Sequence, residues 1–242
     1  QSQNLYIQIT SFRQDNSDVY VADIYLRSMD CLQRGFAGGK WKKTQAKVRV
    51  IAQDNYAVMA MTGDNSQNFT AGWVVANGNI LRKTKNSKRD LCLIYRTGEM
   101  VTLKAAQIDH KKITDEMDQL WQSFLFGPVL LDENGKAMTK FNTNVGPANP
   151  RSVIGYYEPG HYCLVQVDGR RTESRLEKGK INVGMTMKQT SALMEQLGCA
   201  AAYNLDGGQS SVLWYNGENL SNPYNGGRNV MDAVLILDGA VN

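Results

Sequence analysis

Three apolar stretches of this chain each end at an aspartate that has a glycine beside it. The aspartates are Asp64, Asp168 and Asp206, and the stretches that precede them are typical of strands. Carboxylates on loops that a rigid sheet positions are common components of active sites. An Asp-Gly pair is also a frequent turn, so each position taken alone is more often structural than catalytic. The repetition favours a site at which the three strand ends converge.

Two arginines lie in similar surroundings and extend the range of chemistry. Arg151 follows Pro150, and Arg228 follows a pair of glycines. A guanidinium group binds phosphate or carboxylate through two parallel hydrogen bonds. Glycosidic cleavage commonly uses two carboxylates, one as acid or base and one as nucleophile or cation stabiliser. Arginines beside carboxylates would therefore suit a substrate in which a sugar is joined to a phosphate.

Other catalytic arrangements receive less support. Ser210 and Ser211 follow a glycine pair, but the G-x-S-x-G turn of a nucleophilic serine is absent. The two histidines, His110 and His161, lie in a charged stretch and in a turn, and we predict both at the surface. These features weaken a Ser-His-Asp triad and exclude a multi-histidine metal site. The four cysteines form no C-x-x-C pair; Cys92, Cys163 and Cys199 have apolar neighbours and are predicted to be buried thiols, with one or two disulfides left open.

Composition places the chain among folded proteins with a sizeable core. The 242 residues are 42% hydrophobic and 21% charged, with a formal net charge of +4. The basic residues are scattered, and their densest run, within residues 82–89, lacks interleaved aromatics, so nucleic acid is not an expected partner. No apolar run is long enough to span a bilayer. The chain starts at Gln1 without a methionine, which fits a secreted or cell-envelope protein whose signal peptide has been removed.

Strand patterns outnumber helix patterns, and most of the strands are joined by hairpins. We expect an α+β fold with mixed, mainly antiparallel sheets and flanking helices, in a single domain over residues 1–242, of which residues 1–55 are the less certain part. Predicted hairpins join residues 5–12 to 19–26, 73–76 to 80–82 and 91–95 to 100–103. Further strands are predicted at 56–61, 152–157, 162–167, 199–205 and 230–237. Helices are predicted at 44–55, at 115–126 and after the capping box of Thr186 and Gln189, the last ending at Gly198.

Read together, several segments resemble the phosphodiester glycosidase family, which includes N-acetylglucosamine-1-phosphodiester α-N-acetylglucosaminidase and bacterial exopolysaccharide biosynthesis proteins. The resemblance runs from about residue 57 to 237 and is densest after residue 149. The matching segments, in the order of the family, are Thr62 to Asn65, Phe126 to Pro128, Asn149 to Gly155, Val167 to Arg170, Gly184 to Thr186, Asn204 to Ser211 and Gly226 to Val230. Two departures occur: Gln209 replaces a glycine in the N-L-D-G-G-G-S signature, and Thr62 and Asn65 replace an asparagine and an aromatic residue in the first segment.

The resemblance implies a hydrolase that cleaves the bond between a sugar C1 and a phosphate in a sugar-1-phosphodiester of glycans or cell-surface polymers. On this basis Asp206, Asp168 and Arg151 are the expected catalytic residues, with Asp206 nearest the anomeric carbon. Substrate-binding roles are expected for Asp64, Gly207, Gly208, Ser210, Arg228 and Arg170. No cofactor is expected, although a divalent cation on the carboxylates stays open. The alternatives are a non-catalytic carbohydrate-binding or polysaccharide-assembly module with this fold, which the departures favour, and a metal-dependent phosphodiesterase.

Overall fold

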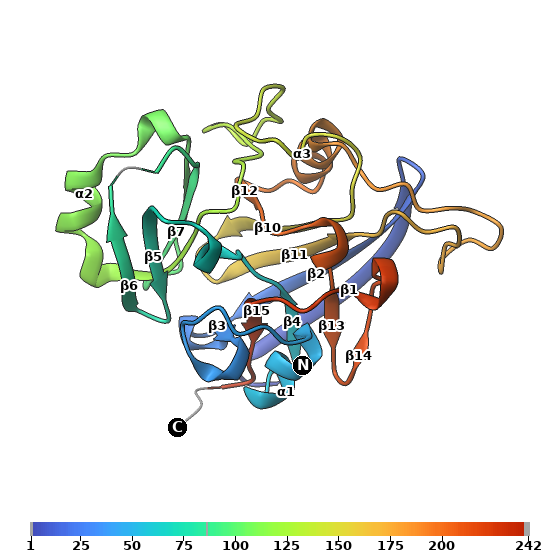
Figure 1. The fold of residues 1–242 in the computed structure, drawn as a ribbon, viewed down its shortest axis with the longest axis horizontal. Helices are drawn as coiled ribbons and strands as arrows, with labels where there is room; N and C mark the ends of the chain where they lie inside the picture. Colours follow the sequence, from blue (N-terminus) through green and yellow to red (C-terminus); the bar gives the residue numbers. More distant parts are fainter. Residues whose placement is uncertain (1, 86, 240–242) are drawn as a thin grey trace.

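The computed structural model describes residues 2–85 and 87–239, so Gln1, on which the export prediction rests, lies outside the described part. Figure 1 shows a sheet-rich molecule with a few short helices at its periphery. All strand pairs within the described ranges are antiparallel. The predicted α+β fold with mainly antiparallel sheets is therefore confirmed.

Two five-stranded sheets share one hydrophobic core. The first has the order β1-β2-β11-β10-β12 and the second has the order β14-β13-β4-β15-β3. Ile24, Ile154 and Leu164 of the first sheet lie in the same buried cluster as Met61 and Val234 of the second. Burial of such a cluster is the main favourable contribution to folding. The bounds of the first sheet are β1 (Leu5–Gln14), β2 (Ser17–Leu26), β10 (Arg151–Glu158), β11 (His161–Val167) and β12 (Ala201–Asn204). Those of the second are β3 (Leu32–Phe36), β4 (Met59–Thr62), β13 (Leu213–Tyr215), β14 (Glu218–Asn219) and β15 (Asp232–Ile236).

A smaller unit, at the left of Figure 1, is built from the middle of the chain. It contains β5 (Gly72–Ala76), β6 (Asn79–Thr84), β7 (Leu91–Tyr95), β8 (Met100–Leu103), β9 (Leu120–Phe124) and helix α2 (His110–Asp115). Trp73, Leu93 and Ile113 lie in its own buried cluster. The predicted hairpins β5–β6 and β7–β8 are both present, because their turns, Asn77-Gly78 and Thr97-Gly98, suit a tight reversal of the chain.

Two of the three predicted helices are present. Helix α3 (Met187–Gln196) has the predicted capping box, in which the Thr186 hydroxyl accepts a hydrogen bond from the Gln189 N–H. Gly198, just after this helix, has φ 78°, a conformation that glycine adopts without strain. Helix α1 (Val48–Asp54) begins four residues later than predicted, with Lys47 at its N-cap position.

The predicted helix over residues 115–126 is wrong. Helix α2 ends at Asp115, and the apolar residues that follow form strand β9, which pairs with β7. All residues of β9 are buried, and its polar side chains bond to neighbouring carbonyls: Gln122 Nε2 donates to the Leu32 oxygen, and the Ser123 hydroxyl donates to the Trp73 oxygen. An amphipathic helix would have left these polar groups in solvent, so pairing with a distant strand overrides the local periodicity.

The ends of several strands meet at one edge of the central sheet. In the register of this sheet Arg151 faces Val167, and Val153 faces Asn204, so the residues before β10, after β11 and after β12 lie near one another. A hydrogen bond of 3.1 Å from the Asp206 N–H to the Gly63 oxygen joins this edge to the end of β4 in the second sheet. The predicted convergence of strand ends therefore has a structural basis in the register of the sheet.

All four cysteines are buried and free, as predicted for Cys92, Cys163 and Cys199. Within residues 2–85 and 87–239, none of the helices combines the length and the apolar character that a bilayer crossing requires.

Candidate active site

The Asp206 carboxylate lies at the end of β12 in contact with a cation. Its Oδ2 atom is 3.0 Å from Nη2 of Arg228, and its side chain is 7% exposed, against 51% for the arginine. Burial raises the pKa of Asp206 above its usual range, while hydrogen bonding from Ser210 and the charge of Arg228 oppose the rise. A carboxylate that is shielded from solvent, with a positive charge on one side, is suited to stabilise a second positive charge.

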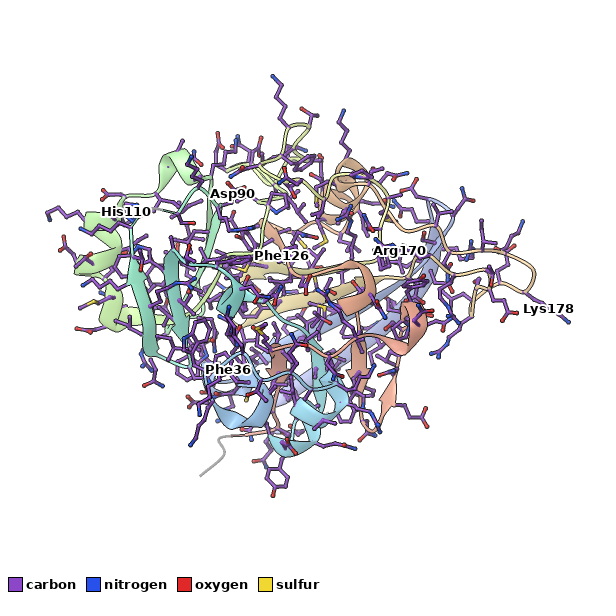
Figure 2. All side chains as sticks on the ribbon, viewed as in Figure 1. Phe36, Asp90, His110, Phe126, Arg170 and Lys178 are labelled. Carbon is purple, nitrogen blue, oxygen red and sulfur yellow. The ribbon has the colours of Figure 1, made fainter. Side chains whose placement is uncertain are left out.

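A cavity of about 280 Å³ opens beside this pair. We call it the arginine cavity, and its lining residues are Phe126, Val145, Asn149, Arg151, Arg170, Asp206, Gly207, Gly208, Gln209 and Arg228. Six residues that the sequence singled out are thus brought together here: Arg151, Arg170, Asp206, Gly207, Gly208 and Arg228. Phe126 and Arg170 are labelled in Figure 2, where the loop that carries Lys178 extends away from them.

Two of these arginines have no acidic partner among the described residues. Arg151 is buried, and its guanidinium donates to the Met185 oxygen at 2.9 Å and to the Pro147 oxygen at 2.5 Å. Arg170 donates to the Asn149 side-chain oxygen. Burial lowers the pKa of Arg151 to about 10, and the positive charge of Arg170 contributes to this shift. A buried cation without a counter-ion, such as Arg151, is costly in free energy. An anionic ligand in the cavity would lower this cost.

The loop that follows Asp206 approaches the neighbouring backbone too closely for side chains. A Cβ atom on Gly207 would lie 2.8 Å from the Pro150 oxygen, and Gly208 has φ 63°. The Gly208 N–H donates to the same Pro150 oxygen at 3.0 Å. Glycine is required at both positions, the first for space and the second for its backbone conformation.

Ser210 and Arg228 fasten the far side of this loop. The Arg228 Nε donates to the Ser210 hydroxyl, and the Arg228 N–H donates to the Gln209 oxygen at 2.9 Å. The Thr62 hydroxyl donates to the backbone carbonyl oxygen of Ser210 and accepts a hydrogen bond from the Val212 N–H. Thr62, which departs from the family pattern, thus anchors the signature loop, whereas Gln209, the other departure, lines the cavity.

Asp64 lies outside the arginine cavity. Its carboxylate is fully buried and accepts the N–H groups of Leu125 and Phe126 at 2.7 and 2.6 Å. Burial raises the pKa of Asp64 to about 6, although Arg34, 3.5 Å away, opposes the rise. The side chain therefore holds the segment that carries Phe126 to the cavity, and the sugar-binding role expected for Asp64 stays a prediction.

Asp168 is also absent from the lining of the arginine cavity, although Arg170 follows it closely. Its Oδ2 atom accepts the Asn222 N–H at 2.8 Å, while Oδ1 has no hydrogen-bond partner within the described part of the chain. Burial raises the pKa of Asp168 to about 7. The position fits a residue that connects the start of the Arg170 loop to the 219–222 segment.

The sequence analysis did not identify two buried charged residues, Arg34 and Asp232, that fix the backbone next to the site. Arg34 Nε lies 2.7 Å from Asp232 Oδ2, and both side chains are buried. Asp232 also accepts the N–H groups of Asp64 and Asn65 at 3.0 and 2.9 Å. This pair fixes the turn after β4, whose Gly63 oxygen holds the backbone of Asp206. The available signal was a charged residue at the edge of an otherwise apolar strand, Asp232 to Ile236.

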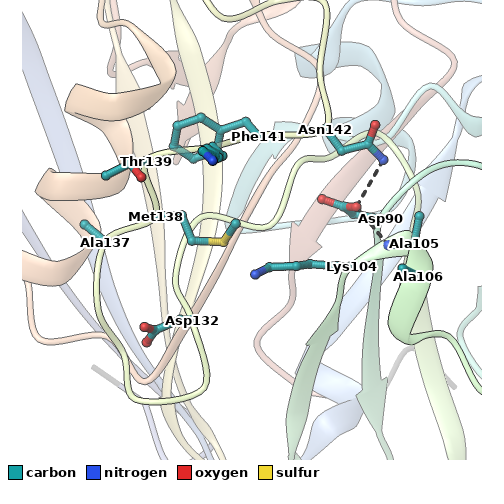
Figure 3. Close-up of a pocket in the computed structure, with 11 residues that line it drawn as sticks. Asp90, Lys104, Ala105, Ala106, Asp132, Ala137, Met138, Thr139, Phe141 and Asn142 are labelled. Atoms are coloured by element: carbon teal, nitrogen blue, oxygen red, sulfur yellow. Dashed lines mark hydrogen bonds between the residues drawn. The ribbon is translucent and has the colours of Figure 1, made fainter.

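A larger cavity, of about 650 Å³, lies elsewhere, beside β8 and the 137–142 segment (Figure 3). Its buried carboxylate, Asp90, accepts the N–H groups of Ala105 and Val129 and the side-chain amide of Asn142. All of these bonds serve to connect segments of the backbone. The cavity has no arginine in its lining, so size alone does not make it the better candidate.

The histidines take part in structural contacts and are half-buried rather than fully solvated. His110 Nδ1 accepts from Trp73 Nε1 at 3.0 Å, and His161 stacks between Tyr25 and Tyr157. Across residues 2–85 and 87–239, the His, Cys, Asp and Glu side chains form no group of three or more that could hold a metal ion. The donor groups therefore do not point to a metal centre.

Comparison with known proteins agrees with this geometry. The sequence model described as phosphodiester glycosidase matches residues 48–237, which include all residues of the arginine cavity. This chain belongs to the phosphodiester glycosidase family. Its N-terminal β1–β2 hairpin precedes the matched segment of the family but is part of the same sheet as β10 and β11.

The individual relatives of this chain are distant. The catalytic domain of zebrafish N-acetylglucosamine-1-phosphodiester α-N-acetylglucosaminidase, auto-inhibited by its pro-peptide, has a TM-score of 0.74 at 18% identity, over 97% of this chain and 83% of that chain. A hypothetical protein from Synechocystis has a TM-score of 0.66 at 13% identity, over 97% of this chain and 62% of that chain. An uncharacterised prophage-derived protein of Bacillus subtilis (strain 168), YomE, is 26% identical over 150 residues, which are 61% of this chain and 22% of that protein. At these identities the solved structures establish the fold alone.

Proposed function

We propose that this protein hydrolyses the bond between the anomeric carbon of a sugar and the phosphate of a sugar-1-phosphodiester. The observation that carries the proposal is the meeting of one shielded carboxylate, Asp206, with a cavity that presents the guanidinium groups of Arg151, Arg170 and Arg228. Membership of the phosphodiester glycosidase family supports the reaction class.

The arginines are the groups that would hold the phosphate. Guanidinium groups bind phosphate oxygens through paired, charge-assisted hydrogen bonds, and three of them can neutralise the charge that grows on the leaving phosphate. In the reaction the C1–O bond breaks, and its electron pair leaves with the phosphate oxygen, which becomes part of a phosphomonoester. Water supplies the new oxygen on C1, keeps one hydrogen there as the anomeric hydroxyl, and gives its other proton to the solvent or to the departing phosphomonoester. Because a phosphomonoester is already a stable anion near neutral pH, no strong general acid is required.

Asp206 is the group that would act at C1. Loss of the phosphate leaves positive charge on the ring oxygen and C1, and a nearby carboxylate stabilises this charge or attacks C1 directly. Arg228, 3.0 Å from Asp206, opposes the rise that burial causes in the pKa of this carboxyl group, and it also lines the arginine cavity. Asp168 and Asp64, expected from the sequence to contact substrate, receive positioning roles in this proposal, because both carboxylates hold backbone segments.

The test is hydrolysis of an α-N-acetylglucosamine-1-phosphodiester, the bond named for the zebrafish relative, in water enriched in oxygen-18. Label in the free sugar and none in the phosphate product would support cleavage of the C1–O bond. Label in the phosphate product would instead indicate attack at phosphorus, as in the phosphodiesterase alternative, and loss of that activity in EDTA would identify a metal-dependent form.

A non-catalytic carbohydrate-binding or assembly module is the second candidate. It is favoured by the single carboxylate in the arginine cavity and by Gln209, whose side chain stands where the family has glycine. Binding of sugar phosphodiesters of several sugars without turnover of any would support this candidate. Secretion or a cell-envelope location remains a prediction, which detection of the native protein in culture supernatant and cell fractions would test.

A further inference from the structure

Two of the four buried thiols face each other inside the molecule. The Sγ atoms of Cys163 and Cys199 lie 3.7 Å apart, within the hydrogen-bond distance of sulfur. Cys163 is in β11, and Cys199 lies just after helix α3, 36 residues further along the chain. In the described part of the chain no other pair of cysteine thiols is hydrogen-bonded, so Cys31 and Cys92 serve as references for an isolated buried thiol.

The backbone of β10 leaves room for both sulfur atoms. Gly155 faces Cys163 in the β10–β11 register and Ala202 in the β10–β12 register. A Cβ atom on Gly155 would lie 2.6 Å from the Cys163 Sγ and 2.8 Å from the Cys199 Sγ. The two sulfurs therefore occupy the space that a side chain at residue 155 would need, and they meet over strand β10.

The segment that carries Cys199 is anchored on both sides yet lies close to solvent. The Cys199 N–H donates to the Met194 oxygen at 3.2 Å, and the Ala200 N–H donates to the Tyr156 oxygen at 2.8 Å. Gly198 and Ala200 are exposed, whereas the side chain between them is buried. A local opening of these few residues is enough to bring the Cys199 thiol into contact with a small solute.

The two thiols differ in acidity. The hydrogen bond with Cys163 lowers the pKa of the Cys199 thiol below its usual value, whereas the same bond, together with burial, raises the pKa of Cys163. The thiolate is the nucleophile in thiol–disulfide exchange, so Cys199 is the thiol that reacts first. Cys163 is then the neighbour that completes the exchange.

We propose that Cys163 and Cys199 form an oxidation site, at which a low-molecular-weight disulfide such as oxidised glutathione converts the two thiols into one intramolecular disulfide. The Cys199 thiolate attacks one sulfur of the oxidant, whose S–S bond breaks, and the first glutathione leaves as a thiolate. The Cys163 thiolate then attacks the Cys199 sulfur of the mixed disulfide and displaces the second glutathione. The two electrons and two protons that the cysteines lose are recovered in two molecules of reduced glutathione.

Oxidation joins β11 to the chain that enters β12, the strand that precedes Asp206. The sulfurs must approach from 3.7 Å to the about 2.0 Å of an S–S bond. The flexible side chain of Met194 can adjust to this movement, because its methyl group borders the same space beside Gly155. Closing a loop of 36 residues restricts the unfolded chain, so the oxidised protein is the more stable form.

Peptide mapping locates the bond, because cleavage after lysine and arginine places each cysteine in a different peptide. Cys163 falls in peptide 152–170 and Cys199 in peptide 189–228, whereas Cys31 and Cys92 fall in peptides 28–34 and 90–96. The folded, reduced chain is incubated with oxidised glutathione at pH 8 until its composition is constant. Remaining thiols are then alkylated and the chain is digested with trypsin. A sample kept with a phosphine reductant is the reference.

We expect peptides 152–170 and 189–228 to be joined after oxidation, with a mass lower by two hydrogen atoms, and peptides 28–34 and 90–96 to be alkylated. Four alkylated cysteines, glutathione retained on Cys199, or a bond to Cys31 or Cys92 would each overturn the proposed site.

The melting temperature of the oxidised and reduced forms measures the effect on stability. Oxidation should raise it by about 5–10 °C in the wild type and in the matched control Cys31→Ala, and should leave it unchanged in Cys163→Ala. An equal effect of glutathione on the wild type and on Cys163→Ala would contradict a stabilising bond at this site. Neither readout depends on hydrolysis, so failure to cleave any phosphodiester would count against the proposed function alone.

Discussion

Asp206 Oδ2 and Arg228 Nη2 lie 3.0 Å apart, and both residues line the arginine cavity. The arginine is half-exposed, whereas the carboxylate is almost fully buried, so the pair presents its cation to solvent and its anion to the interior. Arg228 is held on its other side by the Ser210 hydroxyl. This arrangement makes the carboxylate the group whose replacement should affect chemistry most directly.

The variant Asp206→Asn should hydrolyse a sugar-1-phosphodiester about a thousandfold or more slowly than the wild type. An amide stabilises a cationic transition state far less well than a carboxylate. The fold should persist, because the amide oxygen can still accept from Arg228. Steady-state kinetics and thermal unfolding of the same preparation measure both effects. Asp115→Asn, at an exposed ion pair on α2, is the matched control. Near-wild-type turnover by Asp206→Asn would contradict the assigned role.

The variants Arg170→Gln and Arg151→Met should separate binding from stability. Both remove a guanidinium from the arginine cavity, so both should weaken binding of inorganic phosphate about tenfold or more. Only Arg151→Met should also lower the melting temperature, because it leaves the buried oxygens of Met185 and Pro147 without their donor. Isothermal titration calorimetry measures the phosphate affinity, and differential scanning calorimetry measures the melting temperature. Lys178→Gln, at the exposed end of its loop, serves as the control, and equal phosphate affinity in all three variants would contradict a phosphate site here.

The free energy of unfolding should decrease as the pH rises from about 4 to about 7. Burial raises the pKa of Asp64 to about 6 and that of Asp168 to about 7, from the 3.8 usual for an aspartate, so the folded state binds more protons than the unfolded state in this interval. Asp168→Asn should flatten the upper part of this dependence and raise stability at pH 8, because the amide oxygen can still accept the Asn222 N–H. Urea unfolding of the wild type and of Asp168→Asn from pH 4 to pH 8 measures the free energy of unfolding of each. An unchanged pH dependence in the variant would show that Asp168 does not titrate in this range.

A single methyl group at Gly63 should destabilise the protein by about 2 kcal/mol or more. A Cβ atom there would lie 2.5 Å from Asp232 Oδ2 and 2.9 Å from the Asp232 oxygen, which cannot move without disturbing Arg34. Because the Gly63 oxygen accepts the Asp206 N–H, activity should also fall. Chemical unfolding of Gly63→Ala compared with Gly146→Ala, whose Cβ would meet no atom within 4 Å, provides the test. Equal stability of the two variants would contradict the predicted clash.

Features set by neighbouring residues could be predicted from the sequence. The capping box of Thr186 and Gln189 and the turn at Asn77-Gly78 need only local geometry, and both are present. The segment 115–126 failed because its apolar spacing fits a helix and a buried strand alike, and only pairing with β7 decides between them. Local periodicity contains no information on that distant partner.

The candidate site was predictable to a similar extent. The signature around Asp206 and the arginines at 151, 170 and 228 identified groups that do line one cavity. The sequence could not show that Asp64 and Asp168 turn inward, because a carboxylate after a strand takes either face according to how the chain bends there. Nor could it reveal Arg34, whose partner Asp232 is 198 positions away and meets it only through pairing of β3 with β15.

The three guanidinium groups around one cavity also have a kinetic consequence. A phosphodiester brings a single negative charge, whereas the phosphomonoester that hydrolysis would release carries between 1.5 and 2 negative charges near neutral pH, about twice as much. The cavity would therefore hold the product more tightly than the substrate. We expect turnover to be limited by departure of the phosphomonoester rather than by bond cleavage, with inhibition by accumulated product that eases as ionic strength increases.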